Sequence, residues 1–183
     1  MKISRTLNLV LSCFVILFFC TQSHAQTDAN AEENYDQGFR IGFGINGGYI
    51  FQEPYHFSYG GDVRLQYDLT KRYSITLTGG YSNLTISGNN NDLGFIPVKA
   101  GYKTFVWENQ FYAMGEIGAA FGTTDTYRKT SVIVSPSVGY VCKFIDVSLR
   151  YESFADFPNV KDDGSIGDGV GLVSLRLAYG FKL

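Results

Sequence analysis

The last twelve residues of the chain, Leu172-Val173-Ser174-Leu175-Arg176-Leu177-Ala178-Tyr179-Gly180-Phe181-Lys182-Leu183, alternate between two kinds of side chain. Every odd-numbered position from Val173 to Leu183 is apolar, and the even positions from Ser174 to Lys182 are polar, charged or small. Successive side chains of a β-strand point to opposite faces. The stretch therefore predicts a final strand with one continuous apolar face.

The same alternation recurs in seven upstream segments. The eight predicted strands are Phe39 to Phe51, Ser58 to Thr70, Tyr73 to Ser82, Ile96 to Lys103, Phe111 to Phe121, Val132 to Tyr140, Ile145 to Glu152 and Leu172 to Leu183. A tilted strand crosses a bilayer with ~9 to 11 residues. The pattern predicts an all-β fold, an eight-stranded antiparallel up-and-down transmembrane β-barrel whose apolar side faces lipid.

The connections between these strands alternate in length. The second, fourth and sixth are tight, whereas the others are longer and rich in Gly, Asn, Asp and Thr, the longest being Ser153 to Gly169. Membrane barrels have short periplasmic turns and long extracellular loops, so both termini are expected in the periplasm. Aromatic residues near the strand ends predict two girdles, one periplasmic (Phe39, Tyr67, Tyr73, Tyr102, Phe111, Tyr140, Tyr179) and one outer (Tyr49, Phe51, Tyr59, Tyr81, Phe121, Tyr151).

The first 25 residues have the features of a secretory signal peptide. Lys2 and Arg5 form a basic start, residues 7–20 form an apolar segment, and Ser23-His24-Ala25 supplies a small-x-small cleavage signal. The chain therefore divides into a signal peptide (1–25), a polar, disordered periplasmic segment (26–37) and a barrel (38–183). Export through the Sec pathway and residence in the cell outer membrane are expected.

The residues of this N-terminal segment disfavour two alternative interpretations. A transmembrane helix needs ~20 apolar residues, but the apolar run has only 14 and is interrupted by Asn8 and Ser12. A lipoprotein would be modified at Cys20, but Phe18 and Phe19 stand where lipidation requires small residues. Both features favour the cleaved signal peptide.

Charge and cysteine content exclude two classes of protein. The signal peptide carries two of the 15 basic residues and none of the 17 acidic ones, so the remaining chain has a formal net charge of −4. This mild acidity gives no reason to expect nucleic acid as a partner. Cys13 and Cys20 leave with the signal peptide, and Cys142 alone cannot form an intramolecular disulfide.

Three segments carry a resemblance to a known family: residues 94–102 (GFIPVKAGY), 116–121 (EIGAAF) and 146–152 (DVSLRYE). On these, the chain resembles the "outer membrane protein beta-barrel domain" family, small eight-stranded barrels of the OmpX and OmpA-transmembrane type from Gram-negative bacteria. The resemblance implies a porin-like fold without a pore, and its motifs specify architecture and not activity. Such proteins usually end on an aromatic residue, whereas Leu183 is terminal here and Phe181 lies two residues earlier on the same face.

Two prolines fall inside predicted strands. Pro97 and Pro136 each lack the N–H that a strand donates to its neighbour. A β-bulge or the start of a strand is expected at both positions.

Charged residues collect on the predicted inward face. They are Arg40, Asp62, Arg64, Asp68, Lys99, Lys103, Glu116, Asp146, Arg150, Glu152, Arg176 and Lys182. Buried charges are costly unless they pair, so a lumenal ion-pair network is expected rather than an active site. The interior of an eight-stranded barrel is just wide enough for side chains to fill, which argues against a diffusion pore.

Two sequence motifs offer chemistry, each with a structural alternative. His56-Phe57-Ser58, followed by Asp62 in the same strand, is similar to the His-x-Ser pair of an outer-membrane lipid A deacylase, in which imidazole activates the hydroxyl. The spacing to the acid differs from that family. The oxygen-rich stretch Asp162 to Asp168 resembles a Ca²⁺ loop but lacks EF-hand spacing and its closing Glu, which favours a solvated loop.

The sequence therefore predicts a non-enzymatic outer-membrane barrel without cofactor or metal. Its role would be structural, adhesive or accessory to an envelope complex, through its extracellular loops. Expected partners are outer-membrane lipid and lipopolysaccharide, the barrel-assembly machinery and an envelope protein. The alternatives are a lipid A-modifying hydrolase or acyltransferase using His56 and Ser58, and a soluble lipocalin-type barrel. A lipocalin-type barrel would need an apolar interior, whereas charged residues collect on the predicted inward face of this chain.

Overall fold

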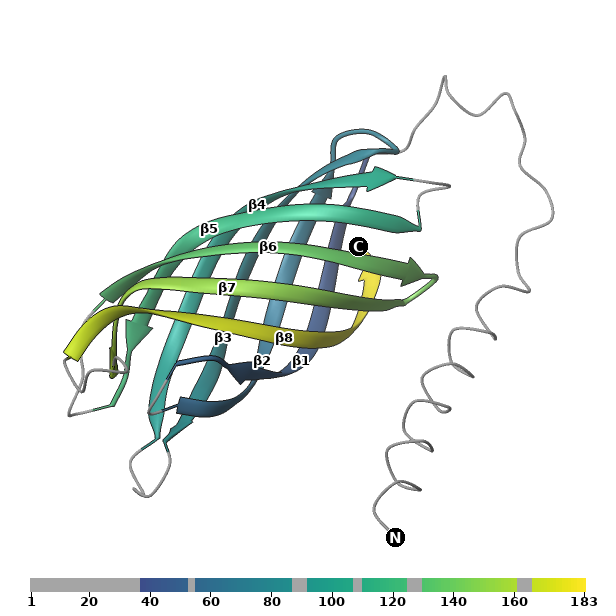
Figure 1. The fold of residues 1–183 in the computed structure, drawn as a ribbon. Helices are drawn as coiled ribbons and strands as arrows, with labels where there is room; N and C mark the ends of the chain where they lie inside the picture. Colours follow the sequence, from purple (N-terminus) through teal and green to yellow (C-terminus); the bar gives the residue numbers. More distant parts are fainter. Residues whose placement is uncertain (1–36, 53–54, 87–91, 107–109, 125–129, 161–165) are drawn as a thin grey trace, which may run out of the picture. The chain divides into compact units, whose positions relative to one another are not determined.

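The computed structural model describes residues 37–52, 55–86, 92–106, 110–124, 130–160 and 166–183. Its eight strands are β1 (Phe39–Ile50), β2 (Tyr55–Asp68), β3 (Tyr73–Ile86), β4 (Leu93–Val106), β5 (Phe111–Gly122), β6 (Thr130–Cys142), β7 (Ile145–Val160) and β8 (Ile166–Lys182). Each strand pairs antiparallel with the next, and β8 pairs with β1 (Figure 1). The predicted fold class, a closed eight-stranded antiparallel barrel, is confirmed.

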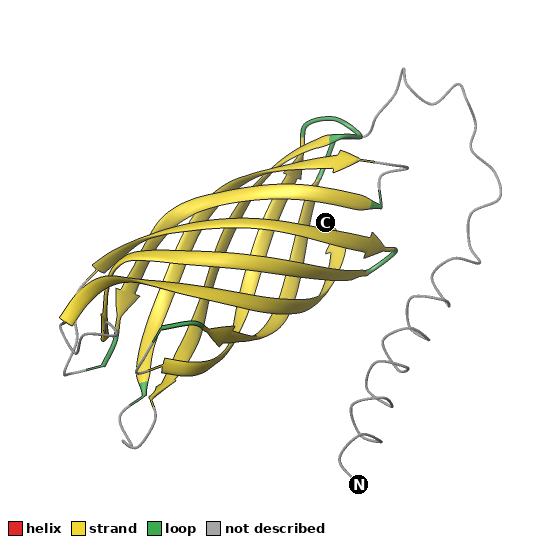
Figure 2. Ribbon diagram, in the orientation of Figure 1, coloured by secondary structure: helices red, strands yellow, loops and turns green. Residues whose placement is uncertain are grey.

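Strand makes up nearly all of the described chain (Figure 2). Among the described residues, no helix is long and apolar enough to span a membrane. The predicted signal peptide (1–25) and residues 26–36 of the periplasmic segment lie outside the described residues.

The two faces of the wall are those that the alternation predicts. On β8, Leu175 and Leu177 are 53% and 47% exposed, whereas Ser174 and Arg176 are buried. Exposed aliphatic and aromatic side chains occur on all eight strands. A continuous apolar exterior of this kind needs an apolar surrounding.

Both ends of the described chain lie at one end of the barrel, here called the terminal end. The Leu183 N–H donates to the Phe39 carbonyl (2.8 Å), and the Asp68 N–H donates to the Gly38 carbonyl (3.1 Å). Aromatic rings pair across strands there, as in Phe39–Tyr67, with centroids 4.8 Å apart. The opposite end, where β1 ends and β2 begins, is called the far end.

Strands β7 and β8 extend further than expected. The predicted long loop Ser153 to Gly169 is wrong, because β7 continues to Val160 and β8 begins at Ile166. The two strands pair as far as Val160 with Ile166, across a register shift between Phe154 and Pro158. Gly169 has a φ of 106°, which a side chain would disfavour, and it lies in this irregular stretch.

The prolines produce neither the bulges nor the strand starts that were expected. Pro97 lies inside β4 and pairs with Ala120 of β5, while Pro136 lies inside β6 and pairs with Gly115 of β5. On the opposite side of each proline the ladder has a gap, without a change of register. This gap in the hydrogen-bond ladder accommodates the N–H that each proline lacks. The expectation of a bulge was therefore wrong.

Candidate functional site

An ion pair between β2 and β8 lies at the middle of the lumen. The Arg176 guanidinium donates through Nε (2.9 Å) and Nη2 (2.5 Å) to Asp62 Oδ1, and both side chains are almost fully buried. Gly44 of β1 provides the space, because a Cβ there would lie 2.8 Å from Arg176 Nε. The bidentate ion pair between Arg176 and Asp62 therefore needs a residue without a side chain at position 44.

Two further carboxylates face this pair from β5 and β7. Glu116 lies 3.5 Å from Arg64 Nη2 and 3.8 Å from Lys99 Nζ, and it accepts a hydrogen bond from Thr78 Oγ1 at 2.6 Å. Glu152 accepts a bond from the Lys99 ammonium at 2.5 Å. One lysine thus links both glutamates.

Arg150 of β7 joins the two groups. Its guanidinium lies 3.8 Å from Asp62, 3.9 Å from Glu116 and 3.5 Å from Glu152. We call the resulting group the central cluster: Asp62, Arg64, Lys99, Glu116, Arg150, Glu152 and Arg176. It holds four cations and three carboxylates, all less than a tenth exposed.

A second group of ion pairs lies nearer the terminal end. Asp68 accepts a bond from Arg40 Nε at 2.6 Å. Lys103 Nζ lies 3.3 Å from Asp146 and 3.8 Å from the centre of the Tyr112 ring, a cation–π contact. Tyr112 also donates to Asp146 at 2.7 Å. Each cation here has its own carboxylate.

Ion pairs thus join Arg40, Asp62, Arg64, Asp68, Lys99, Lys103, Glu116, Asp146, Arg150, Glu152 and Arg176 of the predicted network. Lys182 is an exposed residue at the end of β8. A strand that buries one face fixes the direction of every side chain, which is why the inward parity of the charges predicts that they lie together.

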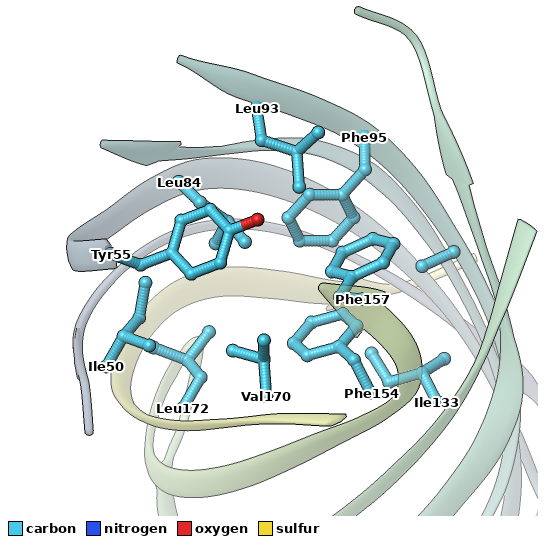
Figure 3. Packing of buried hydrophobic residues seen from close by; sticks show 11 residues of the cluster. Ile50, Tyr55, Leu84, Leu93, Phe95, Ile133, Phe154, Phe157, Val170 and Leu172 are labelled. Atoms are coloured by element: carbon cyan, nitrogen blue, oxygen red, sulfur yellow. The ribbon is translucent and has the colours of Figure 1, made fainter. Parts of the chain in front are cut away.

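The far end of the lumen has a different filling, which the sequence analysis missed. Apolar side chains from all eight strands converge there in what we call the apolar cap (Figure 3): Ile50, Tyr55, Leu84, Leu93, Phe95, Ala120, Ile133, Phe154, Phe157, Val170 and Leu172. Three rings lie together, with Phe154 stacked on Phe157 at 4.8 Å and both edge-on to Phe95. Apolar residues at inward positions near the strand ends are the sequence signal that could have predicted the apolar cap.

His56 and Ser58 do not face each other. An extra residue in β2 shifts its register against β3 between Tyr55 and Phe57. His56 is exposed, and its Nδ1 lies 2.9 Å from the Tyr55 carbonyl oxygen, whereas Ser58 is 1% exposed and points into the barrel. Asp62, the acid of the proposed set, is bonded to Arg176. The bulge therefore separates the imidazole from the hydroxyl that it would have to activate.

Part of the oxygen-rich stretch Asp162 to Asp168 lies outside the described residues. Residues 162–165 lie outside the described residues, and Asp168 is an exposed residue of β8. Within the described part of the chain, no three His, Cys, Asp or Glu side chains gather as a metal site would require. The Cys142 side chain is half-buried.

The comparisons with known proteins concern the fold. No protein-family model matches the sequence, and no curated protein matches it. The N-terminal β-barrel domain of Pseudomonas aeruginosa OprF is similar in structure, with a TM-score of 0.56, 13% identity, and 78% of this chain and 97% of that chain covered.

Two other solved structures are similar. Ail, the attachment invasion locus protein of Yersinia pestis, gives a TM-score of 0.52 at 16% identity, covering 79% of this chain and 99% of that one. A de novo designed transmembrane β-barrel gives 0.50 at 14% identity, covering 79% and 96%. The chain therefore has the fold of the small eight-stranded outer-membrane barrels, as the resemblance of its sequence implied.

Proposed function

We propose that this protein is an outer-membrane barrel that acts through its extracellular loops, in a structural, adhesive or envelope-accessory role. The filled lumen is the observation that carries this proposal. The central cluster and the apolar cap occupy the interior, so the described strands enclose no aqueous path through the membrane. The surfaces left for recognition are the ends of the barrel.

The apolar exterior supports the location. Its exposed side chains suit acyl chains, and the aromatic rings at the terminal end suit a membrane interface. We assign the terminal end to the periplasm and the far end to the cell exterior, after export through the Sec pathway. Outer-membrane lipid and lipopolysaccharide would surround the barrel, and the barrel-assembly machinery would insert it.

An adhesive role has one further support. Ail has a similar fold, is named for attachment and invasion, and has been crystallised with the heparin analogue sucrose octasulfate. A barrel of this fold can thus bind a sulfated ligand. A protein partner in the envelope is the alternative occupant of the extracellular loops.

Loop replacement tests the proposal. Residues 87–91 and 161–165 are replaced together by Gly-Ser segments of equal length, and the barrel is followed by its heat-dependent mobility in gel electrophoresis. We expect an intact barrel in the outer membrane together with lost adhesion of cells to matrix or lost co-purification of envelope proteins. Loop-replaced cells that keep every such property of the wild type would overturn the proposal.

We propose no enzymatic role, and the bulge at His56 supports this choice. The test is the lipid A composition of cells that express the Ser58→Ala variant, measured by mass spectrometry against cells with the wild-type protein. We expect identical acylation. A changed acyl pattern would favour the hydrolase or acyltransferase hypothesis instead.

A further inference from the structure

Several buried donors in and beside the central cluster make no hydrogen bond within the part of the chain that the structure describes. Arg150 Nε and Nη2, Arg64 Nη1 and the hydroxyls of Ser135, Ser137 and Ser174 make no hydrogen bond with any described residue. These five side chains are all less than a tenth exposed. Buried polar groups without a partner are rare in folded proteins and mark sites of bound water, ions or function.

These groups are neighbours on the wall. Arg150 of β7 is the cross-strand partner of Ser137 on β6 and of Ser174 on β8. Ser135 of β6 is the cross-strand partner of Glu116 on β5. Arg64 and Arg150 both lie within 4 Å of the Glu116 carboxylate. Cross-strand partners have Cβ atoms ~5 Å apart, so the hydroxyls flank Arg150.

The charge at this place is positive. The central cluster holds one more cation than carboxylates, and three of its four cations are arginines, which keep their proton. Nearer the terminal end, Arg40 lies 2.6 Å from Asp68 and Lys103 lies 3.3 Å from Asp146, one cation for each carboxylate. An uncompensated charge away from water is costly, and guanidinium N–H groups only donate. The missing partner is therefore an anion.

We propose that the lumen binds a small inorganic anion, a halide of the size of chloride, beside the unbonded N–H groups of Arg150 and within reach of Ser137 or Ser174. A small ion is expected because side chains fill the interior of an eight-stranded barrel. The apolar cap lies at the far end of the lumen, so the ion exchanges from the terminal end.

Bromide is the probe that identifies the site directly. The full protein, purified in detergent, is crystallised with sodium bromide as the only halide, and anomalous differences are measured at the bromine edge. We expect a peak within hydrogen-bond distance of Arg150 and of Ser137 or Ser174. A lumen with ordered water but no bromine signal would overturn the proposal.

Thermal stability provides a second readout that needs no crystals. Between about 1 mM and about 100 mM bromide, with isethionate keeping the ionic strength constant, we expect the unfolding midpoint to rise by about 5 °C and to saturate. The Ser137→Val/Ser174→Val variant should lose this dependence. Ser58→Val is the matched control, since Ser58 is equally buried and unpartnered but lies on β2, and it should keep the dependence.

Other outcomes of the thermal experiment count against the proposal. A midpoint that is independent of bromide in the wild type, or that rises only at molar bromide, would contradict it. So would an equal response to bromide in the serine double variant and in Ser58→Val. Arg150 is left unchanged in this experiment because it also holds three carboxylates of the central cluster.

Discussion

The central cluster and the apolar cap both lie on the inward face of the barrel wall, yet different forces stabilise them. In the central cluster each charge is stable only because others surround it, and removing one leaves its partners buried without compensation. In the apolar cap each side chain contributes by contact, and a smaller apolar side chain can partly replace it. The inward face of this barrel thus changes from specific pairing to adaptable packing along its axis.

The largest effect is expected for Asp62→Ala. Arg176 would lose its bonded carboxylate, and Arg150 would lose one of the three carboxylates near it, in a cluster that already has excess positive charge. The free energy of unfolding should therefore fall by about 3–5 kcal/mol. Urea titration of the protein refolded in lipid vesicles measures the loss. Asp168→Ala removes an exposed carboxylate of β8 and should leave the titration unchanged; equal losses in both variants would refute the pairing argument.

The apolar cap should respond next. Phe95→Ala removes a ring that contacts Phe154 and Phe157, and the free energy of unfolding should fall by about 3 kcal/mol. The comparison is sharpened by conservative variants. Phe95→Leu should restore most of the loss, whereas Asp62→Asn should restore little, because an amide cannot balance a guanidinium charge. If both conservative variants recover equally, the two regions do not differ as described.

Glycine substitutions test how tightly the central cluster is packed. A Cβ at Gly44 would meet the Arg176 guanidinium, so Gly44→Ala should lower the free energy of unfolding by about 1–3 kcal/mol. Gly115 faces open space, with no atom within 4 Å of an added Cβ. Gly115→Ala in the same urea titration should be neutral or stabilising, and a loss equal to that of Gly44→Ala would contradict this reading.

The smallest effect lies outside both regions, in the two-residue turn between β6 and β7. Lys143 has a φ of 50°, a conformation that glycine adopts more easily. Lys143→Gly should therefore raise the free energy of unfolding by about 0.5 kcal/mol, after the greater freedom of the unfolded glycine is counted. Lys143→Ala keeps the backbone strain and should not raise the free energy of unfolding. A lower free energy of unfolding for Lys143→Gly would contradict the presence of strain at residue 143.

The central cluster could be predicted from the sequence, and the apolar cap could not, for physical reasons. A charge such as Arg176 between two leucines marks the buried side of a strand in lipid without any knowledge of its partner. Phe154 and Phe157 lie in a stretch whose Gly, Pro and Asp content favours a loop. Pairing with β8, a tertiary interaction, makes it a strand.

Irregularities in strand register set a second limit on what can be predicted from the sequence. Alternation places His56 and Ser58 on one face, but a single extra residue in β2 separates them. Around Pro97 and Pro136 the opposite holds, since the register stays regular where a bulge was expected. Whether a strand absorbs an irregularity by a gap or by a bulge depends on both neighbouring strands, which local sequence does not reveal.

The sidedness of the wall is measured most directly by tryptophan fluorescence in bilayers of brominated lipid. With Trp107, the single native tryptophan, replaced by Phe, Leu175→Trp would report the exterior of β8 and Phe95→Trp the apolar cap. We predict strong quenching by brominated acyl chains at position 175 and little at position 95. Quenching at position 95 that equals or exceeds that at 175 would contradict a lipid-facing exterior around a filled lumen.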